Sequence, residues 1–100
     1  MQRKIEFSVK AEKSFDKIIT YIEAKWNHTV VERFLLKFDK SVSAIVSNPE
    51  GFPNSEFINV RKCVITKQTT IYYRFNSEKI TIISIFDTRQ NPNKIKKDIK

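Results

Sequence analysis

The first half of the chain places its apolar residues at helical spacing. Apolar side chains recur every three or four positions over residues 10–26 and again from about residue 29 to residue 48. A stripe with this period is typical of a helix that buries one face. We therefore predict two amphipathic helices with stripe side chains in the core. The stripes are Phe15, Ile18, Ile19, Ile22 and Trp26, then Val31, Phe34, Leu35, Phe38, Val42, Ile45 and Val46.

Polar residues and one proline predict where these helices begin and end. Ser8 is placed to cap a first helix that starts near Val9. Thr29-Val30-Val31-Glu32 has the spacing of a capping box, which predicts the start of the second helix. That helix should end near Asn48, because Pro49 disfavours helical geometry in the residue before it. The short break between the helices predicts an antiparallel hairpin.

Four other segments change to the two-residue period of β-strands. They are Lys4–Phe7, Val60–Ile65, Thr70–Phe75 and Lys79–Asp87. The last segment is dense in isoleucine on both faces, which is typical of a central strand covered on both sides. In the third segment Ile71, Tyr73 and Phe75 should share one face, and Tyr72 and Arg74 the other.

The order of elements is β-α-α-β-β-β, and the fold class is α+β. Neither a helical hairpin nor a small sheet buries its apolar side alone, so we expect the hairpin to pack on one face of a mainly antiparallel sheet. We expect one domain over residues 1–100, with residues 93–100 as a basic tail. A single glycine excludes a glycine-rich phosphate-binding loop.

The positive charge is concentrated in the second half of the chain. Residues 59–100 hold ten Lys and Arg against three acids, a net charge of +7, whereas residues 1–58 hold nine against eight. The charge therefore lies on the predicted sheet and tail. Such asymmetry points to a polyanionic partner, either a nucleic acid or a strongly acidic protein segment.

The cysteine count and the hydropathy of the chain further limit the class of protein. Cys63 is the only cysteine, so no intramolecular disulfide is expected, and without a Cys/His cluster we expect no metal site and no cofactor. Cys63 itself is expected to be a small buried apolar residue or an ordinary strand thiol. No apolar stretch reaches the roughly 18 residues needed to span a bilayer. With no signal-peptide pattern either, we expect a cytoplasmic protein without a membrane partner. The basic tail as a membrane-surface anchor stays an alternative, although no lipidation site lies beside it.

The series of motifs resembles the RelE/ParE superfamily of toxins from bacterial type II toxin–antitoxin systems. The matching stretches run in order along nearly the whole chain: Ile5-Glu6-Phe7-Ser8 with Ala11, Tyr21 to Trp26, Asn48-Pro49, Val60-Arg61-Lys62, Ile71 to Phe75, and Ile80 to Ile85 leading into Asp87-Thr88-Arg89-Gln90-Asn91-Pro92. The long helical hairpin and this ending are more similar to the ParE-like branch than to the RelE-like branch.

The resemblance implies a growth-arresting toxin that a cognate antitoxin neutralises in a hetero-oligomeric complex. Toxins of the ParE type act on DNA gyrase, whereas toxins of the RelE type cut mRNA in the ribosomal A site. The antitoxin is expected to lay an acidic and apolar segment over the sheet and the hairpin, with no cofactor involved. We expect the ParE-like activity. A ribosome-dependent mRNA endoribonuclease and a non-toxic nucleic-acid-binding module remain as alternatives.

Whether the chain is an enzyme stays open at this point. Metal-independent RNA cleavage needs cations, a base and an acid. The candidate catalytic cations are Arg61, Lys62, Arg74 and Arg89. The ribonuclease branch of the family commonly supplies acid–base chemistry from a Tyr or His near the C-terminus, and this chain has neither after Tyr73. Thr70 also replaces the cation that this branch tends to carry early in its strand. Both departures favour binding over cleavage.

The candidate binding residues each have a structural alternative. They are Arg61, Arg74, Asp87, Arg89, Lys94, Lys96 and Lys97. Arg61 alternatively forms a salt bridge at the sheet edge, and Arg74 is alternatively a solvated edge residue. Asp87 pairs with Arg89 to close the sheet, or orients Arg89 for function. The tail lysines are alternatively only a solvated segment. His28, in the predicted turn between the helices, is expected to be a surface or capping residue.

Overall fold

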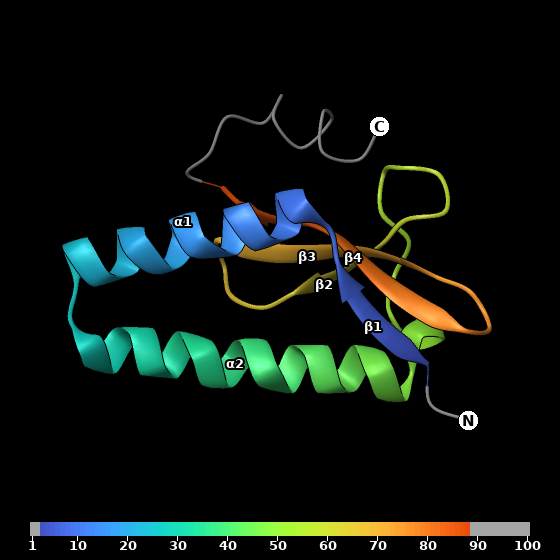
Figure 1. Cartoon of the computed structure of the whole chain (residues 1–100), viewed down its shortest axis with the longest axis horizontal. Coiled ribbons are helices and arrows are strands. Elements are labelled where there is room, and N and C mark those ends of the chain that lie inside the picture. The colour runs from blue at the N-terminus through green and yellow to red at the C-terminus, as the bar shows by residue number, and fades with distance from the viewer. Residues whose placement is uncertain (1–2, 89–100) are drawn as a thin grey trace.

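The predicted helices form an antiparallel hairpin. In a computed structural model, which describes residues 3–88, α1 spans Val9–Lys25 and α2 spans His28–Ser47. The two helices run side by side and are joined by a short turn (Figure 1). The predicted stop before Pro49 is confirmed, since Asn48 is the C-cap of α2. No helix in this part of the chain is both long and apolar enough to cross a bilayer.

The capping of α2 differs from the sequence prediction. Asn27, not Thr29, is the N-cap, and its Oδ1 accepts a hydrogen bond of 3.2 Å from the Val30 N–H. Asn27 has extended backbone angles, whereas Thr29 already lies inside the first helical turn. The capping-box prediction was therefore wrong. Two residues that both suit a cap stood close together, and asparagine is at least as good a cap as threonine.

Four strands form one mixed sheet beside the hairpin, in the order β1-β4-β3-β2. Their bounds are Lys4–Phe7 for β1, Arg61–Val64 for β2, Thr69–Phe75 for β3 and Lys79–Asp87 for β4. β4 pairs parallel with β1 and antiparallel with β3, and β3 pairs antiparallel with β2. The expected mainly antiparallel sheet with a central last strand is confirmed. A 3-10 turn, η1, at Pro49–Gly51 follows α2.

The main core lies between the hairpin and one face of the sheet. Phe15 and Phe38, from opposite helices, pack with ring centroids 4.7 Å apart. The buried members of the core come from both layers and are Ala11, Ile18, Ile22, Val31, Phe34, Phe38, Ile45, Cys63, Ile71, Tyr73, Ile80, Ile82 and Ile85. Burial of these side chains drives the two layers together.

Two predicted stripe residues are not in the core. Trp26 leaves 61% of its surface exposed, and Leu35 leaves 36% exposed. Trp26 fits the spacing of the first stripe, but α1 ends at Lys25 and Trp26 is its C-cap with non-helical backbone angles. The Trp26 side chain therefore does not point along the apolar face of α1, where a continued helix would have buried it. Leu35 lies at the edge of the buried face of α2.

A bulge in β4 reverses which side chains face the helices. Tyr72 pairs with Ser84 and Tyr73 pairs with Ile82, so Ile83 is an extra residue in β4. Before the bulge Ile82 faces the hairpin, and after it Ile85 does so. One extra residue shifts the two-residue period by one position, and every later side chain changes face.

Ser8 links the start of α1 to this bulge. Its Oγ accepts a hydrogen bond of 3.0 Å from the Ala11 N–H and donates one of 2.7 Å to the Ile83 carbonyl. The Ser8 N–H also donates to the Ile82 carbonyl at 3.0 Å. The predicted cap is confirmed, and the same side chain joins the helical layer to the extra residue of the sheet.

Replacing Ser8 with alanine should lower the free energy of unfolding by about 1–2 kcal/mol, because both the cap and the bond to Ile83 are lost. Urea unfolding followed by circular dichroism measures this change. Ser43→Ala is a suitable control, since Ser43 is an exposed residue inside α2 and alanine favours helix. A Ser8→Ala midpoint equal to that of the wild type would contradict the proposed link.

Candidate functional site

The face of the sheet that turns away from the helices has a small apolar cluster of its own. Val60, Tyr72 and Ile83 are buried there, and Phe57 and Phe86 pack against them. Phe57 meets Tyr72 edge to face with ring centroids 6.0 Å apart. The segment between η1 and β2 therefore covers part of this face, which we call the open face because Arg74 is exposed on it.

The side chains of β3 alternate as the sequence predicts. Ile71, Tyr73 and Phe75 pack with the core under the helices, whereas Tyr72 belongs to the cluster on the opposite face. Arg74 follows Tyr73 in the same regular strand, so it lies on the Tyr72 side, and its side chain is exposed.

Arg61 is bound to the main chain of the preceding segment. Its Nη1 donates to the Phe52 carbonyl at 2.6 Å and to the Glu50 carbonyl at 3.1 Å. The guanidinium also lies over the Phe75 ring, 5.5 Å from the ring centroid. Within residues 3–88 it forms no ion pair, so the expected salt bridge at the sheet edge is replaced by bonds to carbonyl oxygens. Arg61 thus fastens the segment after α2 to the first residue of β2.

A third arginine, Arg3, reaches the same aromatic ring. Its guanidinium carbon lies 5.5 Å from the Phe75 centroid, and its Nε donates to the Asn76 carbonyl at 2.7 Å. The pairing of β1 with β4 carries the start of the chain to the β3–β4 turn, where the Lys4 N–H donates to the Glu78 carbonyl. The spacing of residues along the chain does not predict that Arg3 lies close to Phe75, because only the order of strands in the sheet brings the two together.

A shallow pocket of about 370 Å³ lies at this end of the sheet. It is lined by Asn54, Asn59, Arg61, Arg74 and Phe75. Asn59 has a φ of 60°, in the left-handed region that asparagine tolerates better than most residues, and it turns the chain toward β2. Arg3 and Arg61 lie over the Phe75 ring, and Arg61 and Arg74 line the pocket, so we call these three arginines the arginine cluster.

The members of the arginine cluster differ in what they bind. Arg3 and Arg61 each donate to main-chain carbonyls, which fixes their positive charge in place. Arg74 makes no hydrogen bond or ion pair with any residue in the described range 3–88. A fixed positive field beside an uncommitted guanidinium suits a carboxylate or a phosphate, which guanidinium binds in a bidentate manner. The amides of Asn54 and Asn59 add hydrogen-bond donors to the pocket.

The two tyrosines nearest the arginine cluster are poor proton acceptors. Burial raises the pKa of Tyr73 to about 12, and its hydroxyl donates to the Pro49 carbonyl at 2.6 Å. Burial, followed by the negative charge of Glu56, also raises the pKa of Tyr72. Neither phenol is therefore suited to take a proton at neutral pH. His28 starts α2 at the opposite end of the hairpin, where its Nε2 lies 3.2 Å from a Glu32 oxygen.

The comparison that decides the family is a match to a sequence profile. The profile described as "ParE toxin of type II toxin-antitoxin system, parDE" matches residues 5–92. The chain belongs to the ParE toxin family. A search of the curated proteins found no match.

Solved structures share the fold of this ParE-family chain at low sequence identity. A structure titled "Chromosomal ParDE TA system from P. aeruginosa" matches with a TM-score of 0.73 and 17% identity, over 86% of this chain and 96% of that chain. The E. coli DinJ–YafQ toxin–antitoxin complex matches with a TM-score of 0.60 and 11% identity, over 89% and 96%. The YoeB dimer from Staphylococcus aureus matches with a TM-score of 0.60 and 17% identity, over 86% of this chain and 97% of that chain. At these identities the likeness shows a common fold.

In this ParE-family toxin, Asp87 is buried beneath the helices. Only 2% of its surface is exposed, and its Oδ2 accepts a hydrogen bond of 3.3 Å from the Thr69 hydroxyl. The bulge at Ile83 places Asp87 on the helix side of β4, together with Ile85. Asp87 is thus held inside the toxin, which supports a structural or orienting role and not direct contact with a partner.

The other candidate residues of the toxin are placed as follows. Lys62 is half-buried on the open face, where it pairs across the strands with Tyr72. The proposed pair of Asp87 with Arg89 lies outside the described residues, as do the tail residues Lys94, Lys96 and Lys97. Arg61 and Arg74 are therefore the two predicted binding residues that the described part of the toxin brings together.

Sequence reasoning missed three kinds of contributor to this site. Arg3 joins it through strand order, Phe75 through its half-buried ring beneath two guanidiniums, and Asn54 and Asn59 through the loop before β2. A signal existed for Asn59, because asparagine just before a strand is a common left-handed turn residue. Arg3 and Phe75 carried no such signal. Cys63 is buried as expected, and burial raises the pKa of its thiol despite a hydrogen bond with Ser41.

Proposed function

We propose that this ParE-family toxin arrests bacterial growth by binding DNA gyrase through the arginine cluster, and that a cognate antitoxin neutralises it. The observation that carries the proposal is Arg74, an exposed guanidinium that lines a pocket with Arg61 and has no partner within residues 3–88. The neighbouring Arg3 and Arg61 are held by main-chain carbonyls. Their positive charge is therefore fixed in place before an acidic group of the partner binds. Because gyrase acts in the cytoplasm, we expect the toxin to act there as well.

The tyrosines near the arginine cluster and the position of His28 support binding over RNA cleavage. Both nearby phenols have raised pKa values, and His28 lies at the far end of the hairpin. Stabilising a phosphorane charge with arginines alone does not move the proton from the 2′-hydroxyl. The fold that the chain shares with YafQ and YoeB leaves the ribonuclease alternative open.

The gyrase proposal predicts that purified toxin inhibits DNA supercoiling and accumulates cleaved DNA complexes, while ribosome-bound mRNA stays intact. Both assays use the same toxin preparation, with translating ribosomes in one and gyrase with relaxed plasmid in the other. Unaffected supercoiling at stoichiometric excess of toxin would contradict the proposal. Cleavage of mRNA at the A site would favour the ribonuclease alternative.

The antitoxin part of the proposal rests on charge. The chain has a net charge of +8 and a pI of about 9.8, so an acidic partner segment would gain from long-range attraction. The solved relatives titled as ParDE and DinJ–YafQ systems are toxin–antitoxin assemblies in their own right. A small acidic protein encoded beside this gene is the expected partner, and its co-expression should restore growth.

A further inference from the structure

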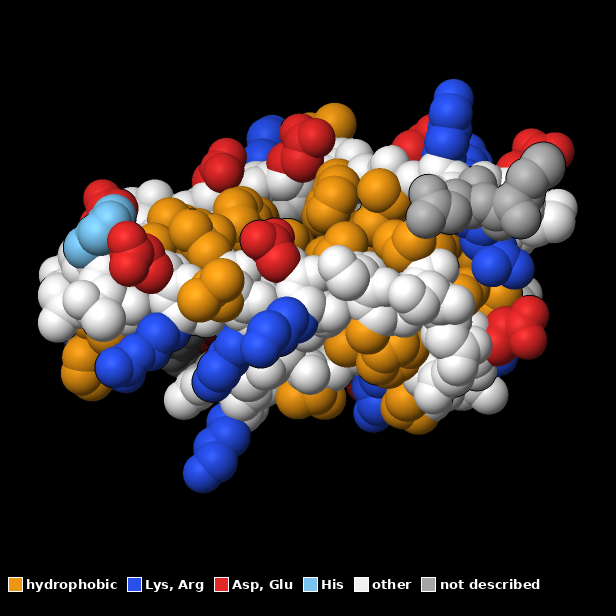
Figure 2. Space-filling view, turned by 90° about the horizontal axis from the view of Figure 1, so that it is seen from below, with side chains coloured by type: hydrophobic (Ala, Val, Ile, Leu, Met, Phe, Trp, Pro, Cys, Tyr) orange, Lys and Arg blue, Asp and Glu red, His pale blue; other side chains and the backbone are white. Residues whose placement is uncertain are grey.

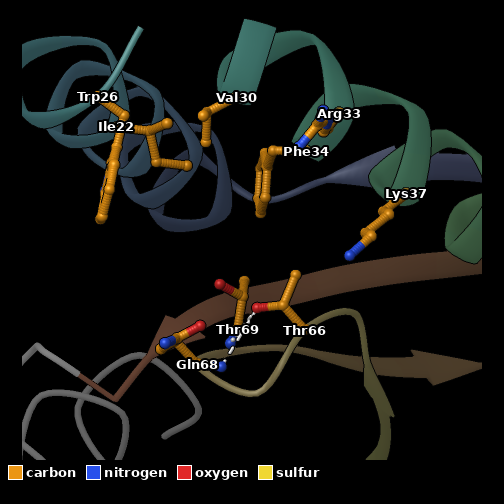
Figure 3. A pocket seen from close by; sticks show the side chains of 9 residues that line it. All are labelled: Ile22, Trp26, Val30, Arg33, Phe34, Lys37, Thr66, Gln68 and Thr69. Atoms are coloured by element: carbon orange, nitrogen blue, oxygen red, sulfur yellow. Dashed lines mark hydrogen bonds between the residues drawn. The ribbon is translucent and has the colours of Figure 1, made fainter.

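A second pocket lies far from the arginine cluster, at the end of the hairpin where α1 meets α2. It has a volume of about 280 Å³ and lies between the helices and the loop from β2 to β3. Figure 3 shows helical side chains above the pocket pointing toward the loop residues below it. The lining consists of Ile22, Trp26, Val30, Arg33, Phe34, Lys37, Thr66, Gln68 and Thr69.

The wall of this pocket is apolar and partly exposed to solvent. Ile22 and Phe34 close it from the core side, and Trp26 stands at its outer edge with 61% of its surface exposed. The rings of Trp26 and Phe34 both point from the hairpin toward the loop, and the side chains of Ile22 and Val30 are drawn between them (Figure 3). A large aromatic side chain exposed beside an apolar wall is typical of a contact surface for a partner.

The rim of the pocket is cationic. Arg33 and Lys37 are one helical turn apart on α2 and therefore lie on the same face. Neither forms a hydrogen bond or an ion pair with another residue in the range 3–88. Seen from the α2 side, Lys and Arg side chains gather along one flank of the helix, and acidic side chains lie along the opposite flank (Figure 2).

The floor of the pocket is polar and preformed. The Thr66 hydroxyl accepts hydrogen bonds from the backbone N–H groups of Gln68 at 3.2 Å and Thr69 at 3.1 Å. The Gln68 carbonyl accepts a bond of 2.7 Å from the Thr88 N–H, and Thr69 is bonded to Asp87. A loop held by these bonds loses little entropy when a partner binds to it.

We propose that this pocket anchors an acidic, apolar segment of the antitoxin. A large apolar side chain of the segment enters the pocket and packs on the wall formed by Trp26, Ile22 and Phe34. Carboxylates next to that side chain pair with Arg33 and Lys37. The inference rests on the proposed function only in naming the antitoxin as the source of the segment. An apolar wall with two cations at its rim matches such a peptide better than a nucleic acid, whose binding depends on rows of phosphate contacts.

The opposite flank of α2 explains why the segment would choose this pocket. A second groove, lined by Phe7, Glu12, Phe15, Asp16 and Phe38, is also apolar but has carboxylates at its rim. An acidic segment is repelled there and attracted to Arg33 and Lys37. The two flanks therefore differ in charge while both offer apolar surface, which fixes the side on which an acidic partner lies.

The test reverses the rim charge in the full-length toxin. Arg33→Glu with Lys37→Glu should weaken binding of the acidic protein encoded by the adjacent gene by about 30-fold or more, as measured by calorimetry. Lys13→Glu with Lys17→Glu is the matched control, because this pair has the same spacing and the same change in charge on exposed positions of α1. The control pair should bind within about threefold of the wild type, since neither lysine lines the arginine-cluster pocket, the Trp26 pocket or the acidic groove.

The single tryptophan of the chain reports on the pocket directly. Excited selectively, Trp26 should shift its emission to shorter wavelength when the adjacent-gene protein binds, because its exposed ring becomes buried. An equal shift with a single-stranded oligonucleotide, lost steeply with added salt, would overturn the peptide proposal in favour of a nucleic acid. Unchanged affinity of the Arg33→Glu, Lys37→Glu toxin, folded by circular dichroism, would also overturn it.

Growth assays separate this inference from the proposed function. The Arg33→Glu, Lys37→Glu toxin should still arrest growth, but co-expression of the adjacent gene should no longer rescue the cells. Full rescue would overturn the inference even if gyrase is the target. Conversely, a wild-type toxin that leaves gyrase unaffected contradicts the proposed target, while weakened binding of the charge-reversed toxin in calorimetry still supports the pocket.

Discussion

Arg74→Glu is expected to abolish growth arrest while the toxin stays folded. The Arg74 side chain is exposed on the open face of the sheet and contributes no bond to residues 3–88, so its loss should change the free energy of unfolding by no more than about 0.5 kcal/mol. The reversed charge would face the acidic group that the arginine cluster is proposed to bind. Gyrase inhibition should weaken by about 30-fold or more, which corresponds to roughly 2 kcal/mol.

Two further variants show whether the effect of Arg74→Glu is specific to its position. Lys13→Glu makes the same kind of charge change on the exposed surface of α1 and should leave growth arrest intact. Arg61→Ala should lower both activity and stability, by about 1–2 kcal/mol for the latter, because the bonds to the Phe52 and Glu50 carbonyls are lost. Full toxicity of Arg74→Glu would remove the arginine cluster as the target-binding site.

Tyr73 is the residue whose loss should cost the most stability. It is fully buried between the sheet and the helices, and its hydroxyl donates to the Pro49 carbonyl. Tyr73→Ala should lower the free energy of unfolding by about 3–5 kcal/mol, because it leaves a large cavity in the core. A protein of this size has a total free energy of unfolding of about 5–15 kcal/mol, so this variant should lose a large part of it and unfold at a clearly lower urea concentration than the wild type.

The conservative variant Tyr73→Phe isolates the hydroxyl. It keeps the ring but leaves the Pro49 carbonyl without its donor, which should cost about 1–3 kcal/mol at pH 7. Tyr72→Phe is the control, since the Tyr72 hydroxyl makes no hydrogen bond with residues 3–88. Urea unfolding of the three proteins measures the difference. Equal midpoints for Tyr73→Phe and the wild type would contradict the anchoring role of this bond.

Alkaline pH should narrow the gap between the wild type and Tyr73→Phe. Burial raises the pKa of Tyr73 from 10.0 in the unfolded chain to about 12 in the folded toxin. The unfolded state therefore loses this proton first, and the associated stability is complete below pH 10 and is lost as the pH rises toward 12. Tyr73→Phe lacks this titration. Unfolding midpoints between pH 9 and pH 11.5 should converge, and parallel curves would contradict the shift.

The sequence predicted the order and type of both α-helices and all four strands, but not the 3-10 turn at Pro49–Gly51, because local signals agreed with one another in those six elements. Ser8 caps α1 as expected, Pro49 limits α2, and the isoleucines of Lys79–Asp87 correctly indicated the central strand. Each of these features depends on residues a few positions apart, where periodicity and capping chemistry act. The family resemblance drew on the same ordered series of segments and is confirmed over residues 5–92.

Local signals failed where a segment ended or two segments met. Trp26 fits the period of the first stripe, but α1 stops one residue earlier and the ring becomes the outer wall of a pocket. Arg3 lies in the half of the chain with little net charge, yet it completes the arginine cluster through the pairing of β1 with β4. Neither outcome depends on neighbouring residues in the chain, so neither could be read from spacing.

The division between sequence and tertiary structure is clearest in β4. The sequence by itself determined that Lys79–Asp87 forms a two-sided central strand, because isoleucine fills both of its faces. Only the tertiary structure decided that Asp87 turns toward the helices, since Ile83 is an extra residue opposite β3. In a strand that is apolar on both faces, the pattern of apolar and polar residues does not reveal an extra residue. One inserted position then reverses the facing of every side chain that follows it.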